Sequence, residues 1–124
     1  MKFKSKHFPS DEVFSRALFQ IAKALELNHC DLTSIFAVDI QTIHTWEAKQ
    51  LFPSSDEVKL SVLLDLVQIY QHLSAIFSNN KDRVLWLRAF HPQLEQVPFE
   101  LMLNSSFGLK DVKEYLEAAR MRGA

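Results

Sequence analysis

Apolar residues recur along this chain at intervals of three and four positions, which is the spacing of an amphipathic α-helix. No segment shows the sustained alternation of apolar and polar residues that is typical of a β-strand. The pattern therefore predicts an all-α fold. The predicted helices span residues 11–27, 30–36, 40–49, 56–77, 82–90, 99–103 and 109–121.

Capping and breaking residues set the predicted helix boundaries. Ser10 is a good N-cap for the first helix, and Asp39 is one for the third. Pro53 ends the third helix, because proline lacks a backbone donor and disfavours helix in the residue before it. Ser54 and Glu57 have the spacing of a capping box and are expected to start the fourth helix.

The fourth predicted helix, residues 56–77, is apolar on more than one side. Leu60, Leu63, Leu64 and Val67 lie along one side, and Val62, Leu66, Ile69, Leu73 and Ile76 lie along another. A helix with so wide an apolar arc is usually buried between two layers or at a subunit interface. We interpret it as a spine between two lobes and as a dimer contact. Its interior polar residues make it too polar to span a bilayer.

Composition narrows the class of protein. A chain of 124 residues suits one domain, or two small helical lobes that share a core. The formal net charge of -1 means that any DNA contact must be local. Cys30 is the single cysteine, which excludes an intrachain disulfide and fits a cytoplasmic protein. Residues 1–9 are basic but have no long apolar segment behind them, so we expect a flexible tail and not a signal peptide.

The second and third predicted helices have the pattern of a helix-turn-helix. In that motif apolar residues lock the helices together, a small residue occupies the turn, and the second helix presents its polar face to DNA. Ala37 stands in the expected turn. The expected locking residues are Leu32, Phe36, Val38, Ile43 and Trp46. The residues expected to face DNA are Gln41, Thr42, His44, Thr45 and Lys49. Residues 38–47 are similar to the Xre-type pattern Val-Ser-x-x-Thr-Ile-x-x-Trp-Glu.

Charge does not decide whether this lobe binds DNA. Over residues 1–55 the acidic and basic residues are equal in number, so the lobe has no basic field to attract phosphates. Two interpretations therefore stay open. The lobe reads DNA through its second helix, or it keeps the fold and serves only packing or dimerisation.

The chain has no recognisable catalytic or metal-binding motif. Its five histidines are scattered, and no HExxH, CxxC or glycine-rich phosphate loop is present. His29 and Cys30 are adjacent, so in a helix their side chains point about 100° apart. We expect a protein that is not an enzyme and needs neither a metal nor a cofactor.

The last third of the chain is expected to form a small helical cap. Trp86, Leu87 and Phe90 supply a large apolar area to its core, with Trp86 as an anchor. Gly108 permits a close approach that a Cβ atom would hinder. On the exposed side of the last helix, the i,i+4 spacing predicts pairs from Lys110 to Glu114 and from Lys113 to Glu117.

The C-terminal third, from Val84 to Ala124, also has a distinctive order of residues. It contains Trp86-Leu87, His91-Pro92, Leu94, Pro98, Leu101, Leu103, Gly108, Val112, Leu116 and a closing Gly123. This order resembles the toxin-binding domain of the MbcA/ParS/Xre antitoxin family. Many relatives have Gly-Gly where this chain has Glu95-Gln96, and Ser105 or Ser106 replaces the usual threonine.

The resemblance implies a function that depends on binding another protein. Antitoxins of this family dock their last helix and the residues after it onto RES-type toxins, which consume NAD. For this chain the implied toxin-binding residues are Arg120, Met121, Arg122, Gly123 and Ala124. The resemblance further implies a homodimer or a larger toxin-antitoxin assembly, and repression of its own operon through the helix-turn-helix.

Together these patterns predict four regions. They are a flexible basic tail (1–9), an Xre-like helix-turn-helix lobe (10–55), a central linking and dimerisation helix (56–79) and a toxin-binding domain (80–124). A second hypothesis keeps the same fold but makes the chain a stand-alone transcriptional regulator, whose C-terminal lobe only mediates oligomerisation.

Overall fold

Helices form in the regions where the apolar spacing predicts them. The computed structural model describes residues 9–122, and this part of the chain contains seven helices and no strand. An isolated β-bridge joins His91 and Gln96. The all-α prediction is confirmed. The helices are α1 (Pro9–Ala24), α2 (His29–Phe36), α3 (Ile40–Lys49), α4 (Glu57–Ile76), α5 (Asn80–Arg88), α6 (Pro98–Asn104) and α7 (Ser106–Met121).

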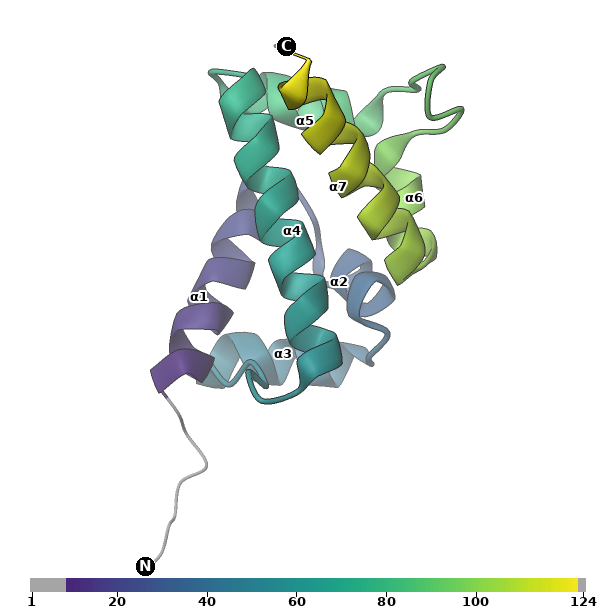
Figure 1. Ribbon diagram of the computed structural model, residues 1–124. Coiled ribbons are helices and arrows are strands. Elements are labelled where there is room, and N and C mark those ends of the chain that lie inside the picture. Colours follow the sequence, from purple (N-terminus) through teal and green to yellow (C-terminus); the bar gives the residue numbers. More distant parts are fainter. Residues whose placement is uncertain (1–8, 123–124) are drawn as a thin grey trace, which may run out of the picture.

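The longest helix, α4, stands at the centre of the molecule and contacts α1, α2, α5 and α7 (Figure 1). α7 runs beside α4 in the same direction, so that the start of α7 lies near the start of α4 and the two ends lie together. α6 packs against α7, and α2 contacts both of them. The N-terminal helix α2 therefore contacts the C-terminal helices α6 and α7 directly.

One apolar cluster runs through all of these contacts. Its fully buried members include Leu18, Leu25, Leu32, Leu63, Leu66, Ile69, Leu73, Leu87, Met102, Leu109 and Val112. Burial of each such side chain contributes roughly 1.5–3 kcal/mol. Helices as short as α2 and α6 are marginal in isolation, so their stability comes from this shared core.

Both apolar sides of α4 are used within the chain. Val62, Leu66 and Ile69 are buried, whereas the outward face of the helix is mostly polar. The exposed residues of α4 are Glu57, Val58, Ser61, Leu64, Gln68, Gln71 and Ala75, so Leu64 is the member of the two apolar sides that is exposed. The wide apolar arc seen in the sequence is thus explained by burial between the N-terminal helices and α7.

The structure corrects several predicted helix boundaries, since α5 spans Asn80–Arg88 and not 82–90, and α7 begins at Ser106 and not at residue 109. α1 ends at Ala24 and not at residue 27, because Glu26 has a φ of 59° and turns the chain away from the helix. α4 is capped by Asp56, whose carboxylate accepts from the backbone N–H groups of Val58 and Lys59, and not by Ser54. An ionised carboxylate next to the helix start is a stronger acceptor there than a more distant hydroxyl.

Ser10 and Ser54, which the sequence predicts as helix caps, have a different role. Ser10 lies inside α1, and its hydroxyl hydrogen-bonds that of Ser54. The Ser54 hydroxyl and backbone N–H both donate to the buried carboxylate of Asp11. These side chains therefore hold the α3–α4 connection against the first turn of α1.

Gly108 marks a close approach between α6 and α7. A Cβ atom at this position would overlap the backbone carbonyl group of Leu101. Because the obstacle is backbone and not a flexible side chain, a larger residue would force the two helices apart. The sequence expectation that a Cβ would be hindered here is confirmed.

We expect Gly108→Ala to lower the free energy of unfolding by about 1–3 kcal/mol through overpacking. The sign of this change in the free energy of unfolding is informative, because a Gly→Ala substitution in an ordinary helix interior stabilises by about 1 kcal/mol. Chemical denaturation measures the difference. Ser106→Ala, at an exposed position in the first turn of the same helix, is the matched control and should change stability little. A stabilised Gly108→Ala variant would contradict this view of the α6–α7 contact.

Candidate functional site

α2 and α3 are joined by a short turn whose backbone matches the expectation for Ala37. This residue has a φ of 57°, in the left-handed region, and its backbone N–H donates to the Thr33 carbonyl. Asp39 then caps α3 by accepting from the backbone N–H of Thr42, as predicted. Hydrogen bonds from the Thr42 hydroxyl and backbone hold the pKa of Asp39 below its usual value.

The predicted locking residues fix the angle between α2 and α3. Leu32, Phe36, Ile43 and Trp46 are buried, and Val38 packs half-buried against the core. The Phe36 and Trp46 rings meet edge to face at 5.4 Å between centroids. The Ser15 hydroxyl of α1 donates to the Trp46 carbonyl at 2.7 Å, which ties the end of α3 to α1.

Most of the residues predicted to face DNA lie on the exposed surface of α3. Gln41, His44, Thr45 and Lys49 are exposed. Thr42 is half-buried, and its hydroxyl donates to Asp39 at 2.7 Å. Four of the five side chains are therefore accessible to a ligand, while the Thr42 side chain serves the cap of its own helix.

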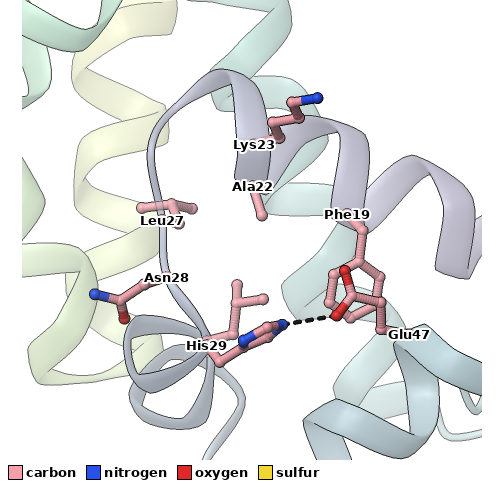
Figure 2. A pocket seen from close by; sticks show the side chains of 8 residues that line it. Phe19, Ala22, Lys23, Leu27, Asn28, His29 and Glu47 are labelled. Carbon is pink, nitrogen blue, oxygen red and sulfur yellow. Dashed lines mark hydrogen bonds and ion pairs between the residues drawn. The ribbon is translucent and has the colours of Figure 1, made fainter.

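A groove of about 360 Å³ lies where α1, α2 and α3 meet, next to this surface (Figure 2). Phe19, Leu27 and Leu32 give it an apolar lining. At its rim His29 pairs with Glu47, with 2.7 Å between Nε2 and Oε1. The His29 ring also contacts the ring of His44 edge to face. The acidic Glu47 thus shares the exposed side of α3 with His44 and pairs with the imidazole ring of His29.

The C-terminal helices are organised around Trp86. Its ring lies 4.5 Å from that of His91 and stacks with that of Tyr115 at 6.1 Å, measured between centroids. The His91 ring also hydrogen-bonds the Trp86 carbonyl through Nε2 at 2.8 Å. Trp86 is half-buried and so acts as the anchor that the sequence predicts. Phe90, which the sequence places in the core, is instead 60% exposed, because α5 ends before it and the chain turns outward.

α7 is held on α4 by charged as well as apolar contacts. The sequence predicts pairs within α7, from Lys110 to Glu114 and from Lys113 to Glu117. Both lysines instead pair with Asp65 of α4, at 2.7 Å from Lys110 Nζ and 3.3 Å from Lys113 Nζ. A buried carboxylate needs cationic partners more than exposed glutamates do, which explains the preference.

The end of α7 carries the predicted toxin-binding residues. Arg120 Nη1 donates to His72 Nδ1 of α4 at 2.9 Å. Met121 is 85% exposed, and Arg122 is exposed and caps the helix through its backbone N–H. Gly123 and Ala124 lie outside the described residues. The described part of this end therefore presents one apolar and two cationic side chains, of which Arg120 is anchored on α4.

Comparison with known families identifies the C-terminal segment. Residues 72–122 match the family described as the antitoxin Xre/MbcA/ParS C-terminal toxin-binding domain. The chain carries a toxin-binding domain of this antitoxin family. The resemblance seen in the sequence is confirmed, and a toxin partner follows from it. No curated protein matches the chain.

One residue of the toxin-binding domain that is not glycine has a left-handed backbone conformation. Glu95, in the loop between α5 and α6, has a φ of 59°. Its backbone N–H donates to the carbonyl of His91 at 2.8 Å. The loop thus contains a left-handed turn that glycine would adopt without strain.

The structure also bears on metal binding and on membrane insertion. Among residues 9–122, no group of three or more histidine, cysteine or acidic side chains is placed to hold a metal ion. No single described helix is both long and apolar enough to cross a membrane, although α4 and α5 together would pass that criterion across a bend of 118°.

His72 makes the stability of the α4–α7 contact sensitive to pH. Burial, together with the charges of Arg120 and Lys113, lowers the pKa of His72 below its usual value of 6.5, and Glu117 opposes the shift. The folded state therefore favours the neutral ring. Its contribution to stability is present above pH 6.5 and is lost as the pH falls through the lowered pKa of the folded state.

We accordingly expect the free energy of unfolding to fall between about pH 7 and pH 5, more steeply in the wild-type chain than in His72→Gln. Denaturant titrations at several pH values measure the difference between the two chains, in which contributions from the other histidines cancel. Equal pH slopes for both chains would exclude this role for His72.

Proposed function

We propose that this protein is the antitoxin of a toxin-antitoxin system, and that it binds a RES-type, NAD-consuming toxin and occludes the toxin's cleft. The observation that carries the proposal is the family match over residues 72–122. The protein acts by occupying its partner and not by catalysis. We further propose that it does so in the cytoplasm.

The end of α7 is the docking element in this proposal. Met121 is large, apolar and 85% exposed, so a partner that covers it would gain the free energy of burying its side chain. Arginine is enriched among the residues that dominate binding energy, and Arg120 and Arg122 flank Met121. The anchoring of Arg120 on His72 supports the proposal further, because a pre-ordered element loses less conformational entropy on binding. Gly123 and Ala124 extend this element in the sequence.

We expect Met121→Ala and Arg122→Ala each to weaken toxin binding about tenfold or more, as hot-spot truncations do. The test is co-purification with the RES-type product of a neighbouring gene, followed by calorimetric titration and an assay of NAD consumption. Both variants should keep the fold, since neither side chain contributes to the core.

Gln20→Ala, at an exposed position of α1 and outside the matched segment, is the control and should bind as the wild type does. If both α7 variants neutralise the toxin fully, the docking site proposed for α7 is wrong. If the wild-type chain neither binds the toxin nor stops NAD loss, the antitoxin proposal itself fails.

We also propose that residues 10–55 form an Xre-like helix-turn-helix lobe through which a dimer represses its own operon. The exposed polar face of α3 supports this, because glutamine side chains read adenine edges in the major groove. Residues 56–79 then link the lobes and mediate dimerisation, and residues 80–124 bind toxin. The stand-alone regulator is the second candidate, and the same geometry of α2 and α3 favours it.

Operator binding tests whether α3 reads DNA, whereas toxin binding separates the antitoxin from the stand-alone regulator. We expect Gln41→Ala to reduce affinity for the operator about 5- to 100-fold while leaving nonspecific DNA binding almost unchanged, because one base contact contributes about 1–3 kcal/mol. Competition binding at fixed salt concentration measures the ratio of the affinities for operator DNA and nonspecific DNA. Gln20→Ala, an exposed glutamine on α1, is the matched control. Equal losses on specific and nonspecific DNA would exclude base reading by Gln41.

A further inference from the structure

We propose that Asp65 is a positioning residue for toxin binding: it fixes the register of α7 on α4 and thereby the direction in which the end of α7 projects. Asp65 lies outside the family-matched segment, which begins at residue 72. The inference rests on the proposed function of the α7 end. It implies that the functional toxin-binding unit extends back into the middle of α4.

The geometry is that of a two-pronged clamp. Asp65 is only 6% exposed, and its two carboxylate oxygens are divided between two lysines of α7. Oδ2 lies 2.7 Å from Lys110 Nζ, and Oδ1 lies 3.3 Å from Lys113 Nζ. Lys110 and Lys113 are one turn apart on α7. A slide or rotation of α7 by one residue would therefore break at least one of the two ion pairs.

The apolar contacts beside the clamp do not set the register as strongly. Leu66 and Ile69 of α4 and Val112 and Leu116 of α7 belong to the same buried core. Aliphatic side chains of similar size can repack against one another with little loss of energy. A buried carboxylate cannot do so, because leaving it without its partners is strongly unfavourable. The ion pairs therefore select one arrangement among several apolar ones.

A second polar contact, between Arg120 and His72, holds the far end of α7 on α4. His72 lies two turns after Asp65 on α4 and holds Arg120, as Asp65 holds Lys110 and Lys113. Between them the two helices run side by side (Figure 1). With both contacts in place, Met121 projects in one direction from the end of α7. With Asp65 neutralised, only the Arg120–His72 hydrogen bond remains of these polar contacts.

Loss of the clamp should change orientation without unfolding α7. Glu114 and Glu117 lie four residues after Lys110 and Lys113, so each lysine has a helical partner available within α7. Released lysines can pair there and keep the helix intact. The expected defect is a spread of α7 orientations and not a loss of helix.

The test uses the full chain with Asp65→Asn, which keeps the shape of the side chain and removes its charge. Ile69→Val is the matched control, because it removes only a buried methyl group from α4, at a core position between Asp65 and His72 in the sequence. Spin labels are placed on Cys30→Ser chains at two exposed positions, Ala48→Cys on α3 and Ala118→Cys on α7. Pulsed electron resonance then gives the distribution of distances between them in the free chain.

We expect Asp65→Asn to broaden or shift the distance distribution and to weaken binding of the purified RES-type toxin about tenfold, measured well below the melting temperature. Ile69→Val should keep a narrow distribution and bind toxin within about twofold of wild type. An unchanged distribution in Asp65→Asn overturns the proposal. Equal losses of affinity in Asp65→Asn and Ile69→Val also overturn it, because Asp65 would then act through stability alone.

Toxin binding by the protein and the orientation of α7 by Asp65 are tested by separate measurements. A wild-type chain that does not bind the toxin overturns the proposed function and with it the role of Asp65 in toxin binding. The distance measurement needs no toxin, so in that case it still decides whether Asp65 fixes the orientation of α7.

Discussion

The packing of α7 along α4 is the contact on which the rest of the structure depends. It brings the apolar side of the last helix onto the central one and places a buried carboxylate between two lysines. α6 is in turn held between α7 and α2, and the loop before α6 is closed by the Trp86, His91 and Tyr115 rings. If α7 were displaced, each of these later contacts would lose its support.

The same packing joins the two halves of the chain into one body. Asn80, at the start of α5, donates to the Ala24 carbonyl at 2.6 Å, and Arg88, at its end, donates to the Glu26 carbonyl at 2.8 Å. The Arg88 guanidinium also lies 3.7 Å from the centre of the Phe99 ring. The turn after α1 is therefore held by the toxin-binding domain. The boundary of the family match at residue 72 is a boundary of sequence similarity and does not divide the core.

Sequence reasoning succeeded where the cause of a structure is local. The cap at Asp39, the turn at Ala37 and the close approach at Gly108 each depend on neighbouring residues or on an unusual residue type, and each is visible in the sequence. It failed where a distant residue competes for the same group. Lys110 and Lys113 have glutamates four residues away, but Asp65 takes both because it is buried and they are within reach. Phe90 was misplaced because apolarity alone does not reveal that α5 ends before it.

The residues that identify the toxin-binding domain are largely those that build it. Trp86 and His91 close the loop, and Gly108 allows α6 and α7 to touch. Side chains committed to internal contacts leave little surface for a partner, so they specify the scaffold and not the identity of the toxin. The large apolar residues Leu85, Phe90, Phe107 and Met121 are exposed and have no such internal task. Since binding energy concentrates in exposed anchors that become buried, selectivity among toxins should lie in these residues.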